Sequence, residues 1–192
     1  MLNISLKQAV GQIPADVKLF IKKAAIGLIA WLICYNFIMQ PLRVPDKWLT
    51  NFTAVTTKNT LNRFYSKGFT TRLLDKVTAE DHQLFGTSIN LNNSEILYIA
   101  DGCNAFELYV LYIAFLLCLP STKKRMGTFI IIGVLAIFAL NIARCYALAI
   151  MSIHQSSWLN VAHHYIFTIV VYSCIFYLWV LYTRKNNPSN AI

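Results

Sequence analysis

One stretch of the chain decides its fold: residues 127–151, GTFIIIGVLAIFALNIARCYALAIM. It carries a single charged residue, Arg144, and it exceeds the roughly 20 apolar residues that a helix needs to cross a bilayer. Lipid offers no hydrogen-bond partners to an open backbone, so a segment of this kind has to be helical. The sequence therefore predicts a membrane-spanning helix over residues 127–151.

Three further apolar runs accompany this stretch, at residues 24–39, 103–119 and 163–182. The chain has 192 residues, of which 57% are hydrophobic and only 13% charged. Because the apolar residues gather in long runs instead of amphipathic patterns, a soluble domain is excluded. We predict an all-α, polytopic membrane helix bundle with about four transmembrane helices.

Short basic flanks predict the orientation of this bundle. Lysines precede the first run, Lys123, Lys124 and Arg125 separate the second from the third, and Arg184 and Lys185 follow the fourth. Positive charge favours the cytoplasmic side, so both termini are expected there, and the formal net charge of +9 is read as a topology signal, with no nucleic-acid partner. The predicted organisation is a cytoplasmic or interfacial segment (1–23), a first helix (24–39), an extracytoplasmic segment (40–102), three helices (103–182) and a cytoplasmic tail (183–192).

Some local structure is predicted outside the spans. Residues 1–17 favour a short surface helix, with Ile4, Leu6, Val10 and Ile13 as its apolar positions. In the extracytoplasmic segment, three-to-four spacing of apolar residues predicts a helix over residues 60–77, and alternation around Asn92-Asn93 predicts a hairpin over residues 87–99. A segment of this size cannot bury a core alone, so we expect it to pack on the bundle.

Cys103 differs from the other four cysteines in its neighbours. No Cys-x-x-Cys pair is present, so neither a zinc site nor a thioredoxin-type pair is indicated. Cys103 follows Asp101-Gly102, a turn and cap signature, which places it at the first turn of a helix. There the helix dipole favours a thiolate, the nucleophilic form of cysteine.

Two charged residues are expected near Cys103. Arg144 is costly at membrane depth unless it faces protein or water, and Asn141 lies one turn before it on the same helical face. Glu107 lies one turn after Cys103, so an ion pair between Glu107 and Arg144 is the favoured interpretation, ahead of a proton-transfer role for Glu107.

His163 and His164 open the fourth run at the same face of the membrane, where one of them could take the proton of a cysteine thiol. His154, in the preceding loop, is an alternative base, whereas His82 has no supporting neighbour. No ligand spacing of the His-Glu-x-x-His type is present, so neither a metal nor an organic cofactor is indicated.

Taken together, these motifs resemble the exosortase/archaeosortase family of membrane-embedded cysteine transpeptidases. The resemblance rests on Asp-Gly-Cys-Asn at 101–104, Asn-x-x-Arg at 141–144 and a His-His pair before an aromatic-rich span, and it covers roughly residues 90 to 182. The Cys-Ser-Gly-type motif of the family is replaced here by Cys103-Asn104-Ala105.

The resemblance implies a role for each residue. Cys103 would be the nucleophile, Arg144 would stabilise the thiolate or the oxyanion, and His164 or, alternatively, His163 would be the acid/base group, with Glu107, Asn104 and Asn141 in support. It implies a compact bacterial enzyme of the inner membrane, with its site at the extracytoplasmic face. Its substrates would be exported proteins that carry a C-terminal sorting signal with a transmembrane helix, and the released acyl group would pass to water or to another acceptor.

Two rival interpretations remain. A thiol redox membrane protein would pair Cys103 with Cys145. A non-catalytic scaffold or transport subunit, embedded in membrane lipid, would use Glu107 and Arg144 as a structural pair.

Overall fold

The computed structural model of the chain describes residues 15–65, 68–79, 82–119 and 121–184, and for residues 15–16, 74–79 and 82–84 it describes the backbone only. Most of the surface helix predicted over residues 1–17 therefore lies outside the described residues. The elements follow one another as α2 (Ala15–Cys34), π-helical η1 (Tyr35–Met39), α3 (Gln40–Leu42), α4 (Asp46–Tyr65), β1 (Phe69–Ala79), β2 (His82–Leu91), β3 (Ser94–Ala100), 3-10 helical η2 (Asp101–Cys103), α5 (Phe106–Cys118), α6 (Lys123–Ile153), α7 (Leu159–Val161), π-helical η3 (Ala162–Ile166) and α8 (Phe167–Arg184).

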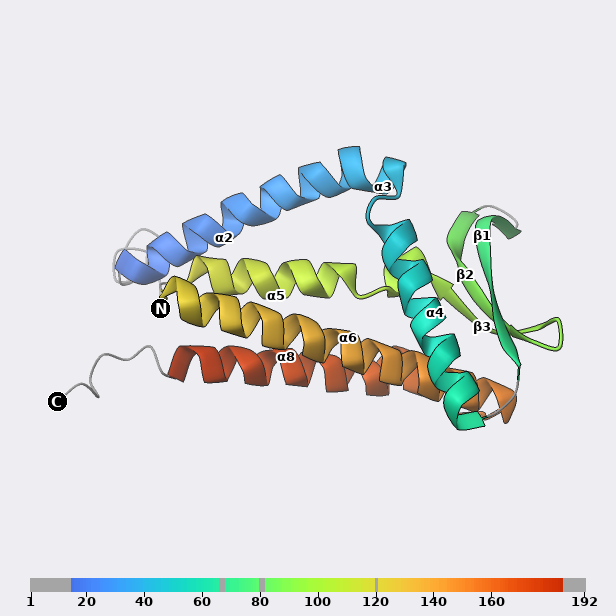
Figure 1. Cartoon of the computed structure of the whole chain (residues 1–192). Helices are drawn as coiled ribbons and strands as arrows, with labels where there is room; N and C mark the ends of the chain where they lie inside the picture. The colour runs from blue at the N-terminus through green and yellow to red at the C-terminus, as the bar shows by residue number, and fades with distance from the viewer. Residues whose placement is uncertain (1–14, 66–67, 80–81, 120, 185–192) are drawn as a thin grey trace, which may run out of the picture.

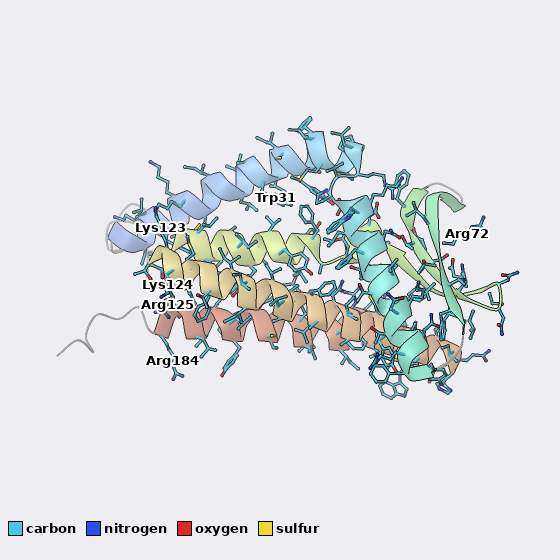
Figure 2. All side chains as sticks on the ribbon, viewed as in Figure 1. Trp31, Arg72, Lys123, Lys124, Arg125 and Arg184 are labelled. Atoms are coloured by element: carbon cyan, nitrogen blue, oxygen red, sulfur yellow. The ribbon has the colours of Figure 1, made fainter. Side chains whose placement is uncertain are left out.

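Four helices form an elongated bundle: α2, α5, α6 and α8 run along one long axis (Figure 1). Helix α4 crosses one end of this bundle, and the strands lie beyond it. The first and last described residues lie at the opposite end. Figure 2 shows Lys123, Lys124, Arg125 and Arg184 at that opposite end, which we call the basic end, and Arg72 on the sheet, at what we call the sheet end.

Among the described residues, two helical runs are long and apolar enough to cross a membrane: Lys123–Ile153, with 31 residues, and Leu159–Arg184, with 26 residues. They correspond to the predicted third and fourth spans. The predicted second span is helical only from Phe106 to Cys118, and 13 residues at about 1.5 Å each reach about two thirds of a bilayer core. The predicted first span lies within the helical run formed by α2 and η1, but the count of four spans stays a prediction.

The prediction of an all-α protein is wrong for the segment after α4. The structure contains a three-stranded antiparallel sheet in the order β1-β2-β3. The hairpin predicted over residues 87–99 is confirmed: Leu91 pairs with Ser94, and Asn92 and Asn93 turn the chain at φ values of 52° and 64°. Positive φ at both central residues is the requirement of a tight hairpin turn, and asparagine tolerates it better than most residues.

The helix predicted over residues 60–77 is wrong beyond Tyr65. From Phe69 the chain forms β1, which pairs with β2 in a register that sets Phe69 opposite Leu91. Two causes favour the strand. Threonines are frequent after Gly68, and β-branched side chains fit a pleated surface. In addition, β2 offers β1 backbone hydrogen-bond partners along one edge.

The sheet packs on the bundle, as expected for a segment that cannot form its own core. Its buried apolar side chains meet α4 and the sheet-end half of α6 in one cluster, formed by Ala54, Leu61, Phe69, Ile89, Ile99, Cys145 and Ala149. A second cluster joins α5, α6 and α8 along the bundle, formed by Ala105, Tyr112, Leu116, Ile137, Val171, Ile175, Leu178 and Tyr182. The chain from β3 to α5, which carries Cys103, lies where these two clusters meet.

Candidate functional site

Cys103 lies in a tight turn between sheet and bundle. Strand β3 ends at Ala100, η2 covers Asp101–Cys103, and α5 begins only at Phe106. The prediction that Cys103 occupies the first turn of a helix is therefore wrong. The reason is Ala105, which adopts a left-handed conformation with φ 65° and ψ 15° and so separates the turn from α5.

The left-handed conformation of Ala105 matters because the Cys-Ser-Gly-type motif has glycine at this position. Glycine adopts φ near +60° without penalty, whereas a Cβ atom makes the same conformation cost roughly 1 kcal/mol. Ala105 stands where the Cys-Ser-Gly-type motif has glycine, and the chain keeps the conformation that glycine would favour.

Asn104 joins the turn to α4 through one end of its carboxamide and to the start of α5 through the other. Its Nδ2 donates to the Asp46 carboxylate at 2.9 Å and to the Thr50 hydroxyl at 3.2 Å, and its Oδ1 accepts from the backbone N–H of Phe106 at 2.8 Å. Asn104 is only 2% exposed. Burial raises the pKa of the Asp46 carboxyl, and the hydrogen bond from Asn104 opposes this shift without cancelling it.

Asp101 ties the other side of the turn to the residue that follows α3. The guanidinium of Arg43 donates to one oxygen of Asp101 through Nε at 3.0 Å and through Nη2 at 2.8 Å. The same guanidinium lies over the ring of Phe85, 4.1 Å from its centroid. Sequence reasoning found neither Arg43 nor Asp46, and only Pro45-Asp46 gave a hint, as a helix-start signature.

Helix α6 supplies Asn141 and Arg144. Asn141 is buried, and its Nδ2 donates to the backbone carbonyl of Cys103 at 3.3 Å. The prediction that Asn141 and Arg144 share a helical face near Cys103 is confirmed, since both side chains line one cavity beside the turn. The Nε atom of Arg144 is buried and has no hydrogen-bond partner among the described residues.

That cavity has a volume of about 200 Å³ and lies between α5, α6 and α8. Gly102 and Ala105, on either side of Cys103-Asn104, form its edge at the turn, while the half-buried Cys103 packs against the cluster that contains Cys145. The full lining is Gly102, Ala105, Glu107, Leu108, Ile137, Asn141, Arg144, Phe167, Thr168, Val171 and Tyr172.

Glu107 lines the cavity but does not pair with Arg144. Both residues are described by the structure, and no ion pair joins them. Glu107 is exposed, in the first turn of α5. The predicted structural pair is thus replaced by two opposite charges on the wall of one cavity.

The two histidines lie side by side in η3, just before the cavity-lining part of α8. Their rings are perpendicular, with centroids 4.7 Å apart. His163 is half-buried and interacts electrostatically with Arg144, whereas His164 is exposed. Among the described residues, no hydrogen bond joins the Cys103 thiol to either ring, and catalytic hydrogen bonds commonly tighten only when substrate binds.

The remaining candidates are placed elsewhere. His154 caps the end of α6, where its Nε2 and the hydroxyl of Tyr65 are 2.8 Å apart. His82 begins β2, and its side chain is not among those described. Cys103 and Cys145 are free thiols, and Cys145 is 2% exposed, so the thiol that a redox role requires has little access to solvent. Within the described part of the chain, no group of His, Cys, Asp or Glu is gathered that could hold a metal ion.

The fold and site define a membrane helix bundle in which a cysteine turn, an arginine and a histidine pair surround one end of a central helix. The family model of the transmembrane exosortases matches residues 16–181, and the chain belongs to this family. This confirms the family expected from the sequence motifs. No curated protein and no solved structure matches the chain.

Proposed function

We propose that this protein is a cysteine transpeptidase or protease of the bacterial inner membrane that cleaves C-terminal sorting signals of exported proteins. Membership of the exosortase family supports a membrane transpeptidase. The observation that carries the residue assignment is the attachment of the Cys103 turn to both α4 and α6, beside a cavity that Arg144 lines. A nucleophile held on a turn, next to a cation that forms no ion pair among the described residues, is suited to acyl transfer.

The proposed orientation follows from the distribution of charge. Lys123, Lys124, Arg125 and Arg184 gather at the basic end (Figure 2), and positive residues favour the cytoplasmic side. Both termini are then cytoplasmic, and the sheet and the Cys103 turn lie at the extracytoplasmic face. A substrate anchored by its own transmembrane helix would dock against the bundle from the lipid, with its cleavage motif at the level of Cys103.

In the proposed reaction, a histidine takes the proton of the Cys103 thiol, and the thiolate attacks the scissile carbonyl. The oxyanion of the tetrahedral intermediate is stabilised by the guanidinium of Arg144, whose buried Nε lacks a partner among the described residues. Collapse of the intermediate breaks the peptide C–N bond, and the histidine returns its proton to the leaving amine. An acyl group then remains on Cys103 as a thioester, until water or another acceptor takes it.

The structure bears on which histidine acts. Sequence motifs favour His164, whereas partial burial and a position close enough to Arg144 to interact with it favour His163. Their rings lie next to each other in η3, so both are candidates for the base. The proposal therefore assigns the acid/base role to the pair and leaves the choice to the variants tested below.

The proposal is tested in the cells that express this protein. Replacing Cys103→Ala should cause exported proteins with a C-terminal transmembrane helix and a basic tail to accumulate with that tail intact, as read by mass spectrometry of membrane proteins. Cys145→Ala, the same change at a thiol outside the proposed chemistry, should leave processing intact. Unchanged C-termini in the Cys103→Ala cells would contradict the proposal and favour the scaffold interpretation.

A further inference from the structure

The cavity contains two opposite charges that do not neutralise each other. Glu107 reaches it from the first turn of α5, and Arg144 from α6, without an ion pair between them. Glu107 is exposed, and the buried Nε of Arg144 has no hydrogen-bond partner among the described residues, so both charges remain available to a ligand. The rest of the lining is largely apolar, including Leu108, Ile137 and Phe167, with Thr168 and Tyr172 on α8.

The position of Glu107 relative to the nucleophile is fixed by the fold. Only Asn104, Ala105 and Phe106 separate it from Cys103, and Asn104 is held to α4 and to the start of α5. Ala105 and Glu107 line the same cavity. A molecule that occupies this cavity therefore contacts the carboxylate of Glu107 while it lies beside the turn that carries Cys103.

These features match the acceptor half of a transfer reaction. An amine acceptor arrives as a positively charged ammonium group and has to lose a proton before its nitrogen can attack a thioester. A carboxylate both attracts the ammonium group and accepts the proton. Water can also give a proton to a carboxylate, but it carries no charge and is not held there by charge attraction.

Resting on the proposed function above, we propose that this cavity binds a primary amine as the acceptor, with its ammonium group on the Glu107 carboxylate. Glu107 takes one proton from the ammonium group, and the free amine attacks the thioester carbonyl on Cys103. The oxyanion faces Arg144, the C–S bond breaks, and Cys103 leaves as a thiolate. The new C–N bond becomes an amide when its nitrogen passes a second proton to that thiolate through the histidine pair, and Glu107 releases its proton to water.

The test uses the full chain in nanodiscs and p-nitrophenyl acetate as an acylating probe. Release of p-nitrophenol reports acetylation of Cys103, and its steady rate reports deacylation. Two acceptors are added in turn at pH 7: glycinamide, which is mostly protonated there, and hydroxylamine, which is mostly neutral. The native chain is compared with Glu107→Gln and with Glu95→Gln, the same change at an exposed residue of β3 outside the cavity.

The proposal predicts that Glu107→Gln lowers the glycinamide-dependent rate by roughly 100-fold, the range of general-base effects. The hydroxylamine-dependent rate and the acetylation burst should change by less than about 3-fold, because neither needs the carboxylate. Glu95→Gln should match the native chain with both acceptors.

Two outcomes would overturn the proposal. Equal rates in Glu107→Gln and the native chain with glycinamide would show that the carboxylate does not hold the acceptor. An equal loss with both acceptors would show that Glu107 acts on the turn instead of on the amine. Absence of any burst that Cys103→Ala removes would be a different failure, since it would overturn the proposed cysteine chemistry itself.

Discussion

The two ends of the bundle are held together in different ways. At the basic end, aromatic rings and main-chain hydrogen bonds close the space between α5, α6 and α8. Phe115 stacks on Trp179 with ring centroids 4.1 Å apart, and Arg125 donates to the backbone carbonyl of Tyr182 at 2.6 Å. Tyr112 is fully buried, and its hydroxyl donates to the Phe129 carbonyl at 2.8 Å. This end is a closed apolar core in which the Tyr112 hydroxyl and the Arg125 guanidinium are paired, whereas the buried indole Nε1 of Trp179 has no hydrogen-bond partner among the described residues.

At the sheet end, the same three helices leave a cavity, and a few polar contacts position the turn beside it. Arg43 binds Asp101, and Asn104 joins the turn to Asp46 on α4. Arg144 keeps a buried Nε without a partner among the described residues. The comparison teaches that helix packing closes one end, while the proposed function gives a use to the cavity and to the Arg144 Nε at the other.

The largest effect is expected from Gly133→Ala, which disrupts side-chain packing at the basic end. The ring of Tyr112 packs directly on Gly133, so an added methyl group would collide with the ring and displace it from the core. Overpacking of this kind costs up to about 3 kcal/mol, and we expect a clear fall in the thermal unfolding temperature in detergent. Gly127→Ala, also in α6 but with open space around the added carbon, should be neutral or slightly stabilising. Equal unfolding temperatures for the two variants would contradict the packing described here.

Asp101→Ala should weaken the contacts at the sheet end and leave the packing of the basic end unchanged. This change leaves the guanidinium of Arg43 without its carboxylate partner, at a cost of roughly 1–3 kcal/mol. Hydrogen exchange should rise in the turn at residues 101–105 and stay unchanged around Tyr112. Asp101→Asn, which keeps an acceptor of the same shape, should give a smaller effect. A rise in exchange at both ends would show that the two regions are not independent.

Ala105→Gly should strengthen the turn. Glycine adopts the left-handed conformation without penalty, so we expect a gain of about 1 kcal/mol in unfolding free energy, reduced by the greater freedom of glycine in the unfolded chain. The matched change Ala147→Gly, inside α6, should instead cost about 1 kcal/mol. Destabilisation by both changes would contradict the left-handed turn.

The smallest expected effect is a pH dependence from Asp46. Burial raises the pKa of its carboxyl in the folded state, so the folded state holds its proton more tightly than the unfolded chain. The contribution to stability is therefore fully present below the ordinary pKa of aspartate and is lost as the pH rises through the raised pKa. Asp46→Asn should flatten this part of the stability curve, measured by thermal unfolding between pH 3 and 7. An unchanged slope would assign the dependence to another group.

Sequence patterns predicted what depends on local composition. The spans over residues 127–151 and 163–182 follow from apolar length, and the hairpin follows from Asn92-Asn93. The strand β1 was not predicted, because the apolar spacing in residues 61–77 also fits a helix and only pairing with β2 decides between the two. Local spacing carries little information about such long-range pairing.

The candidate site shows the same limit. The motifs placed Asn141 and Arg144 correctly near the turn of Cys103, since each lies on a predicted helix. The contacts of Arg43 and Asp46 with that turn span 58 residues of sequence, which no pattern of spacing reveals. The left-handed conformation of Ala105 ends the turn before α5, so Cys103 lies outside that helix. The absence of an ion pair between Glu107 and Arg144 was likewise visible only in the three-dimensional structure.

The central claim is that the sheet end activates Cys103, and the most direct test is the rate of its alkylation by iodoacetamide between pH 6 and 9. Peptide mass spectrometry would follow the native chain in nanodiscs beside Arg144→Ala, His163→Ala and His164→Ala. The account predicts that native Cys103 is alkylated faster than Cys103 in Arg144→Ala and in one of the two histidine variants. Equal alkylation rates of Cys103 in all four chains would contradict it.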